Sequence, residues 1–168
     1  LRSLLSAEVA QGQNLRVQTQ VSANPLLRLM GCINYALKYP YGCTEQRSST
    51  LMPWLLHAEL SPICSEMQSK SALQVQQVVD ETINTLFSRQ CEDGGLSYWS
   101  GEDSSCLWAS AHAAMVLTIA EERGFAVPEH RMEALRDYLR RVDEQSDDED
   151  LSAYTRYSIA YALHDEAA

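Results

Sequence analysis

The chain has 168 residues, of which 45% are hydrophobic and 21% charged, and this is enough to bury one sizeable hydrophobic core. Its 23 acidic residues outnumber 13 Lys and Arg, so the formal net charge is −10. An acidic surface repels phosphate backbones, and a nucleic-acid partner is therefore not expected. No apolar run reaches the roughly 20 residues of a transmembrane helix, and residues 1–10 lack the basic and apolar regions of a signal peptide.

The cysteines are odd in number and show no metal-binding spacing such as C-x-x-C. We therefore expect no metal and no cofactor. Four of them are interpreted as mostly buried thiols, because free cysteine is among the most buried residue types. The set is Cys32, Cys43, Cys64, Cys91 and Cys106.

Residues 1–24 differ from the remainder of the chain. Residues 15–21 alternate apolar and polar side chains, which is the period of a strand. We expect residues 1–24 to form an extended linker or the edge of a preceding β domain.

From residue 25 onward the pattern predicts helices. A leucine-rich helix must end before Pro40, because a residue that precedes proline avoids the α region. Residues 39–42 are then a turn. A second helix begins at Cys43 or Thr44, and Pro53 is expected to kink or divide it.

The later helices alternate in character. Residues 71–89 and 128–142 are amphipathic, whereas residues 106–122 and 151–163 are apolar almost all round, which predicts burial on most sides. Residues 91–101 form a loop around a Gly-Gly breaker, and Gly124 is a plausible helix stop. The aromatic residues Trp99 and Trp108 are expected to anchor a loop or the core.

A faint internal repeat supports stacked helical hairpins. Pairs of similar residues recur at a constant offset of 46: Trp108 with Tyr154, Ala114 with Ala160, and Leu117 with Leu163. Repeats of this length are typical of helix-hairpin arrays. The fold class predicted is all-α, with helical hairpins forming a partial α/α toroid; an open solenoid is the alternative.

Residues 39–46 read Tyr-Pro-Tyr-Gly-Cys-Thr-Glu-Gln and suggest a covalent site. Side chains three positions apart meet across one turn at a helix start, and a thiolate is a strong nucleophile. Attack of the Cys43 sulfur on the Gln46 carboxamide would expel ammonia and leave an internal thioester. The free N–H groups of the helix start would stabilise the thiolate and polarise the carbonyl, and Gly42 would give the backbone freedom to turn.

This segment resembles the thioester signature Gly-Cys-x-Glu-Gln of the α2-macroglobulin and complement family, which is usually preceded by proline and an aromatic residue. Pro40 and Tyr41 match those positions, and Gly42 and Glu45 complete the motif around Cys43 and Gln46. Thr44 is similar to bacterial members. A bare C-x-x-Q could be coincidence, but the residues at 48–53, the loop at 93–99 and the helix of Trp108 also resemble the family.

The resemblance implies that residues 25–168 are the N-terminal half of a thioester domain in a broad-spectrum protease inhibitor, not an enzyme. The thioester would acylate nucleophiles on an attacking protease, which is thereby trapped. The other partners implied are further domains of a large parent chain. The bacterial relatives imply a periplasmic or cell-envelope location.

Two further expectations concern surfaces. Tyr39, Pro40 and Tyr41 could form an apolar lid over the thioester; unchanged methylamine reactivity after Tyr39→Ala or Tyr41→Ala would reject this. A partial toroid exposes inner apolar surface, so self-association is also expected.

Some eukaryotic relatives use a distant downstream histidine to select hydroxyl targets. Only His164 lies at about the right distance, and it lacks a convincing local match. His112 is expected to be a packed, hydrogen-bonded core residue, and no histidine is assigned a catalytic role.

Two alternatives remain open. The Gly-Gly-aromatic pattern also resembles α/α-toroid enzymes such as terpene cyclases and prenyltransferases, although the acidic residues 147–150 read as an inter-helix loop. The other alternative is a structural module that carries no live thioester.

Overall fold

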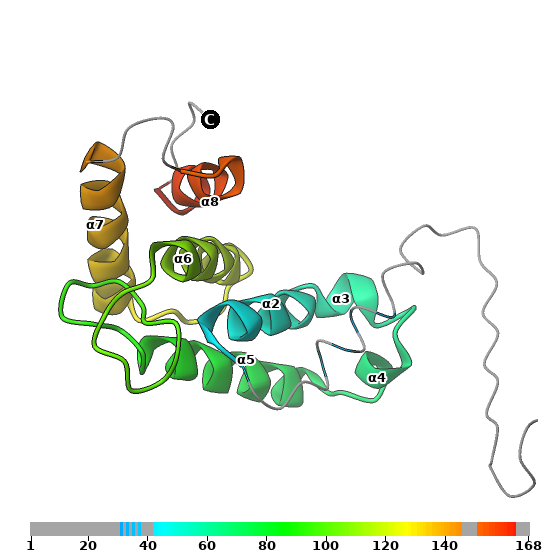
Figure 1. Cartoon of the computed structure of the whole chain (residues 1–168). Helices are drawn as coiled ribbons and strands as arrows, with labels where there is room; N and C mark the ends of the chain where they lie inside the picture. The colour runs from blue at the N-terminus through cyan, green and yellow to red at the C-terminus, as the bar shows by residue number, and fades with distance from the viewer. Residues whose placement is uncertain are drawn as a thin grey trace, which may run out of the picture.

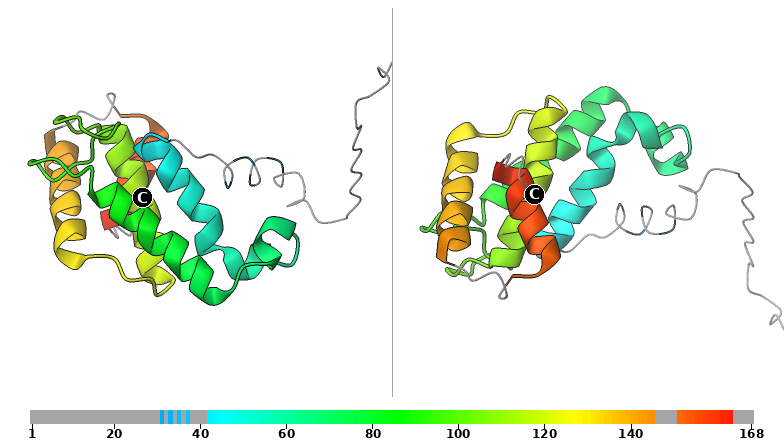
Figure 2. Two further views of the ribbon diagram at one scale, coloured as in Figure 1. Left: turned by 90° about the horizontal axis from the view of Figure 1, so that it is seen from below. Right: turned by 90° about the horizontal axis from the view of Figure 1, so that it is seen from above.

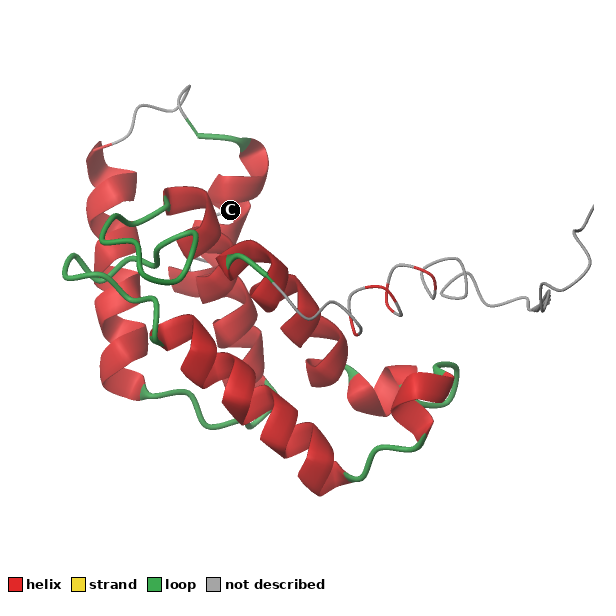
Figure 3. Ribbon diagram, turned by 60° about the horizontal axis from the view of Figure 1, so that its bottom comes forward, coloured by secondary structure: helices red, strands yellow, loops and turns green. Residues whose placement is uncertain are grey.

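The computed structural model describes residues 42–145 and 151–163, together with positions 31, 33, 35 and 37. Within this part the chain is helical and has no strand (Figure 3). It has only two isolated antiparallel bridges, Gln90 with Leu96 and Ser97 with Ser105. The all-α prediction is thereby confirmed. The helices are α2 (Thr44–Leu55), α3 (His57–Leu60), α4 (Ser65–Gln68), α5 (Ala72–Phe87), α6 (Leu107–Glu122), α7 (Glu129–Gln145) and α8 (Ala153–Leu163).

Several sequence expectations concern residues outside the described part. They include the extended segment 1–24, most of the leucine-rich helix, the proposed lid residues Tyr39, Pro40 and Tyr41, and His164. Ile33 and Leu37, from the leucine-rich segment, are helical and pack half-buried against the core. None of the helices described is long and apolar enough to cross a membrane.

The long helices form an inner row and an outer row. In the inner row α6 lies between α2 and α8 and packs against both, while α5 covers α2, and α7 covers α6 and α8 (Figures 1 and 2). The amphipathic helices α5 and α7 are the outer ones. This arrangement agrees with the alternation of buried and amphipathic helices that the sequence predicts.

The central helix α6 is buried around most of its circumference, because its small and apolar residues allow neighbours to approach from several sides. It ends where predicted. Gly124 adopts a φ of +83°, its N–H donates to Glu121 O (2.9 Å), and the N–H of Phe125 donates to Ala120 O (3.0 Å). These two bonds are a Schellman motif, which satisfies carbonyls that the helix itself leaves free.

Other local expectations are met only in part. Pro53 lies inside α2, and the helical run breaks at Leu56, three residues after the proline, before α3 begins at His57. Trp99 and Trp108 are 50% and 39% exposed and are not core residues. Of the cysteines described, Cys43 and Cys64 are buried, whereas Cys91 and Cys106 are only half-buried.

The outer helix α5 begins with a capping box. The backbone N–H of Gln74 donates to Ser71 Oγ (3.3 Å), and the N–H of Ser71 donates to Gln74 Oε1 (3.0 Å). Both residues are exposed. This reciprocal pair satisfies two N–H groups that would otherwise be free at the helix start.

Candidate functional site

The inner helix α2 begins with the same kind of box, in which cysteine replaces serine. Cys43 is the N-cap residue in extended conformation, and its side chain faces the backbone N–H of Gln46. In return, the N–H of Cys43 donates to Gln46 Oε1 (3.1 Å). The two side chains of the sequence motif are therefore folded over the same helical turn. Cys43 is 1% exposed, and Gln46 is half-buried.

Gly42 precedes this box, and the physical reason for glycine differs from the one expected. Its φ does not lie in the left-handed region that favours glycine. A Cβ atom at this position would instead lie 3.1 Å from Gln46 Cβ and 3.5 Å from Gln46 Oε1. Glycine here leaves room for the Gln46 side chain to fold back toward Cys43.

Glu45 joins the cysteine to a line of polar side chains. The Cys43 thiol donates to Glu45 Oε2 (3.9 Å), and Ser49 Oγ donates to Glu45 Oε1 (2.9 Å). Ser49 Oγ also lies 3.0 Å from His112 Nε2 of α6, and His112 Nδ1 lies 2.5 Å from the Tyr154 hydroxyl of α8. The line thus crosses all three inner helices.

His112 is packed and hydrogen-bonded, as the sequence predicts, and is 8% exposed. Trp108 stacks against its ring with centroids 6.1 Å apart, and Tyr154 lies at 5.8 Å. Burial lowers the pKa of His112, and the negative charge of Glu45 acts in the opposite direction. Trp108 and Tyr154, which occupy equivalent positions of the 46-residue repeat, therefore both contact the ring of His112.

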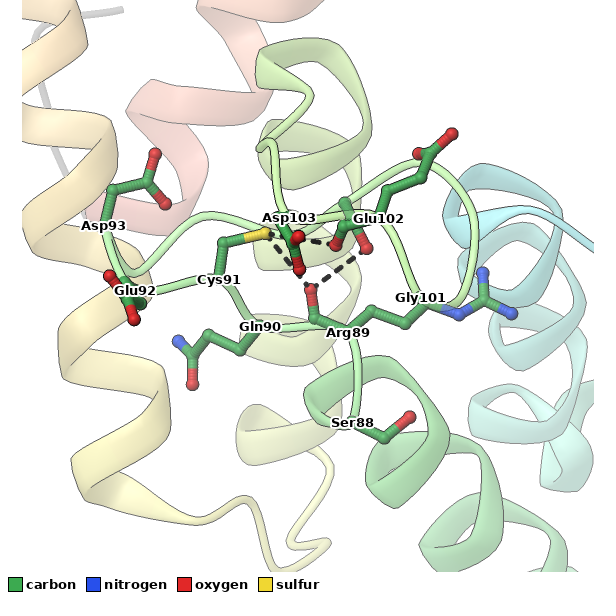
Figure 4. A pocket seen from close by; sticks show the side chains of 10 residues that line it. Ser88, Arg89, Gln90, Cys91, Glu92, Asp93, Gly101, Glu102 and Asp103 are labelled. Atoms are coloured by element: carbon green, nitrogen blue, oxygen red, sulfur yellow. Dashed lines mark hydrogen bonds between the residues drawn. The ribbon is translucent and has the colours of Figure 1, made fainter.

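Arg89 places a buried cation beside the start of α2. Its Nη2 donates to Gly42 O (2.9 Å), and its Nη1 donates to Thr44 Oγ1 (3.2 Å). Burial, followed by the charge of Arg47, lowers the pKa of Arg89, while the charge of Cys43 raises it. Figure 4 shows the side chain of Arg89 extending from the end of α5 toward α2.

The loop between α5 and α6 covers the cysteine. The N–H of Thr44 donates to Tyr98 O (2.9 Å), and Thr44 Oγ1 donates to Ser97 O (2.5 Å). A side-chain hydrogen bond to Cys43 raises the pKa of Tyr98 to about 12, and the charge of Cys43 adds to this effect. The segment that covers Cys43 is therefore distant in the sequence, because Ser97 follows Thr44 by 53 positions.

Two glycines allow the backbone of this loop to lie close to the outer helix α7. Gly94 has a φ of +90°, and a Cβ there would lie 2.3 Å from Ala134 O; a Cβ at Gly95 would lie 2.5 Å from Ser105 Oγ. The sequence predicts these glycines as loop breakers. The structure adds that the backbone approaches its neighbours too closely for any side chain.

A pocket of about 610 Å³ is lined by residues of this loop, starting directly after α5. Four of its ten lining residues are acidic. Arg89 and Ser97 also line the pocket, and both contact Thr44, the residue that follows Cys43. In the part of the chain that the structure describes, no group of three or more His, Cys, Asp or Glu is placed to hold a metal ion. The lining residues are Ser88, Arg89, Gln90, Cys91, Glu92, Asp93, Ser97, Gly101, Glu102 and Asp103.

The structure therefore brings together Cys43, Gln46, Gly42 and Glu45. Sequence reasoning missed the contacts of Arg89, Tyr98 and Tyr154, and that of Ser49 with His112, because each depends on packing between segments far apart in the chain. Pro40 and Tyr41 lie outside the described residues.

The fold and the site together define the class of protein: an all-α domain of paired inner and outer helices, in which a buried cysteine and a half-buried glutamine cap the start of an inner helix. Comparison with models of known protein families gives no match. Comparison with individual proteins does. The chain is 30% identical over 114 residues to an alpha-2-macroglobulin of Escherichia coli K12 (68% of this chain, 7% of the relative), and 30% identical over 115 residues to one of Rickettsia conorii (67% and 6%).

Solved structures agree with this relationship. Native E. coli alpha-2-macroglobulin, from domain MG7 to the C-terminus, has a TM-score of 0.64 and 26% identity, and the match covers 82% of this chain and 22% of that one. Salmonella alpha-2-macroglobulin reacted with methylamine has a TM-score of 0.63 and 29% identity (80% and 9%). The chain belongs to the alpha-2-macroglobulin family, and its similar relatives are bacterial. It spans 7% or less of the length of these two curated relatives.

Proposed function

We propose that this chain is part of the thioester domain of a protease-trapping inhibitor, and that Cys43 and Gln46 form its thioester. The observation that supports this best is the box at the start of α2, because it directs the sulfur of Cys43 and the carboxamide of Gln46 over one helical turn. Membership of the alpha-2-macroglobulin family supports the same proposal.

The proposed chemistry has two stages. In the first, a bond forms between Cys43 Sγ and Gln46 Cδ, the carbon–nitrogen bond of the amide breaks, and the thiol proton leaves with ammonia. In the second, an amine or hydroxyl of an attacking protease adds to Gln46 Cδ and the carbon–sulfur bond breaks. The target is then held through an amide or ester, and the proton that it loses returns to the Cys43 sulfur.

The remaining parts of the proposal concern partners and place. Residues 25–168 would form the N-terminal half of the domain, and other domains of a large parent chain would pack against it. Exposed Trp108, Tyr154 and Tyr157 on the inner helices α6 and α8 offer an aromatic surface for such packing, or for self-association of the isolated chain. A periplasmic or cell-envelope location is proposed from the bacterial relatives.

Intact mass before and after methylamine treatment tests the proposal. A live thioester gives a chain lighter by one ammonia, and methylamine then adds at Gln46 while the Cys43 thiol becomes titratable. Peptide mapping locates both changes. Neither a mass deficit nor methylamine incorporation, in protein freshly purified within its parent chain, would leave the structural module as the better description.

A further inference from the structure

The hydrogen bonds around Glu45 have a direction that the chemistry of the groups determines. An ionised carboxylate only accepts hydrogen bonds, so Ser49 Oγ donates its single proton to Glu45 Oε1. The contact between Ser49 Oγ and His112 Nε2 (3.0 Å) then requires His112 Nε2–H as the donor. A neutral imidazole with a proton on Nε2 accepts at Nδ1, where the Tyr154 hydroxyl lies at 2.5 Å.

All donors in this line therefore point toward one carboxylate. Tyr154 donates to His112, His112 donates to Ser49, and Ser49 donates to Glu45. Such chains strengthen each bond in turn. Burial, which lowers the pKa of His112, favours the neutral ring that this direction requires.

The line fixes one oxygen of Glu45 and leaves the other for the cysteine. Oε1 is held by Ser49, and Oε2 lies 3.9 Å from Cys43 Sγ, with the thiol as donor. Neither ring nitrogen of His112 is free for the sulfur, because one contacts Ser49 and the other contacts Tyr154. A nucleophile, a base that contacts it and a group that orients the base are the three parts of an activated nucleophile.

We propose that Glu45 is the catalytic base that removes the Cys43 proton when the thioester forms, and that Ser49, His112 and Tyr154 are positioning residues that orient Glu45. Glu45 Oε2 takes the thiol proton as Sγ attacks Gln46 Cδ. The same proton passes from Glu45 to the amide nitrogen as the carbon–nitrogen bond breaks, and ammonia leaves. In reaction with an amine, Glu45 takes a proton from the attacking nitrogen and returns it to the departing sulfur. This role rests on the proposed thioester function.

The principal test compares rates of thioester formation during refolding, followed by the appearance of the ammonia-deficient mass in the protein that carries this chain. Glu45→Gln preserves the size of the side chain and its bond from Ser49 but cannot take a proton. We expect formation to slow by about 100-fold, the lower end of general base contributions. Formation of the thioester in Glu45→Gln at the wild-type rate would overturn the base role.

Paired variants test the positioning residues and do not depend on how Glu45→Gln folds. Ser49→Ala removes the hydroxyl and should slow formation about tenfold, the equivalent of one hydrogen bond to a charged group, whereas Ser49→Thr keeps the hydroxyl and should restore the rate. His112→Gln keeps a donor near Nε2 and should exceed His112→Leu in rate. Equal rates within each pair would overturn the positioning role, because a general packing effect would not follow the presence of the donor.

Nitrogen NMR of the wild-type thiol form examines the hydrogen-bond direction itself. The expected ring has a protonated Nε2 and an unprotonated Nδ1 at His112. A proton on Nδ1 instead of Nε2 would mean that His112 does not donate to Ser49. That result would overturn the proposal that His112 and Ser49 orient Glu45. Absence of any thioester in the wild type would overturn the proposed function and the base role with it, whereas a wild-type thioester that Glu45→Gln forms equally fast would overturn the base role alone.

Discussion

Two helices of this molecule begin with nearly the same side-chain arrangement and have different surroundings. At α5, Ser71 and Gln74 exchange hydrogen bonds; at α2, Cys43 and Gln46 take the same two positions. The local difference at the N-cap is one atom, because sulfur replaces oxygen.

The environment of the two boxes differs far more. Ser71 and Gln74 are exposed, and Leu73 between them is 78% exposed. The α2 box has Glu45 in the place of Leu73, Arg89 against its preceding carbonyl and the loop around Tyr98 over its cysteine. A capping box at a helix start is therefore not a reactive site by itself. Burial and the charged neighbours are what make the α2 box a candidate reactive site.

Replacing the sulfur of the α2 box should have the largest effect. Cys43→Ser turns it into a copy of the α5 box, so we expect complete loss of the ammonia-deficient mass and of methylamine incorporation. The helix should stay folded, because serine is a favourable N-cap residue. Cys106→Ser, at the N-cap of α6, is the matched control and should keep full incorporation. Incorporation in Cys43→Ser would show that another group reacts.

Displacing the loop over the α2 box should be the next largest effect. Gly94→Ala combines a positive φ with a Cβ placed 2.3 Å from Ala134 O, and we expect it to lower the free energy of unfolding by about 3 kcal/mol or more. Gly101 also has a positive φ, but no atom lies within 4 Å of its Cβ position. Gly101→Ala should therefore cost only about 1 kcal/mol. Denaturant unfolding measures both, and equal costs would contradict the close approach.

Removing the buried cation should have a moderate effect. Arg89→Met deletes two hydrogen bonds, to Gly42 O and Thr44 Oγ1, and leaves the carbonyl without this donor. We expect a loss of about 2 kcal/mol in the free energy of unfolding. Arg140→Met removes exposed ion pairs with Glu133 and Asp137 and should cost under about 1 kcal/mol. A smaller loss for Arg89→Met than for Arg140→Met would argue against a structural role for the buried cation.

The titration of Tyr98 reports on the covered sulfur. In the methylamine-treated form, with the Cys43 thiol free, Tyr98 should titrate at about 12, chiefly because of its hydrogen bond to Cys43. Cys43→Ala should return its pKa toward the usual value of about 10. Burial is the main cause that raises the pKa of Tyr138 to about 12, so the pKa of Tyr138 should not change in this variant. Ring-carbon NMR resolves the two, and an unchanged Tyr98 in Cys43→Ala would exclude the contact.

The smallest effect is expected from copying the cysteine into the exposed box. Ser71→Cys creates a second C-x-x-Q at α5, and we expect no ammonia loss there, because Leu73 cannot act as a base. Ser71→Cys with Leu73→Glu supplies the carboxylate and should give at most slow, partial loss. Peptide mapping distinguishes the two boxes. Rapid thioester formation in the single variant would show that the surroundings of α2 are unnecessary.

Local features were predictable from the sequence because local interactions decide them. The start of α2 at Thr44 and the end of α6 before Gly124 follow from capping residues within a few positions. The alternation of inner and outer helices follows from the distribution of apolar residues around each helix.

The surroundings of the site were not predictable in the same way. Arg89 reaches Gly42 across 47 positions, and Ser49 reaches His112 across 63. No short sequence motif predicts such contacts, since they form only when α2, α5 and α6 pack against one another. Gly42 shows the same difficulty: the motif identifies this glycine, but the reason for it lies in the folded position of the Gln46 side chain.

The box at the start of α2 also has a consequence for the covalent product of the proposed reaction. The N–H of Cys43 donates to Gln46 Oε1, which is an oxygen that remains on the side chain when a target amine replaces sulfur at the carbonyl carbon. The reaction would thus leave intact the bond that closes the first turn. In the proposed reaction the target would therefore be attached at the start of α2, a helix that packs against both α5 and α6.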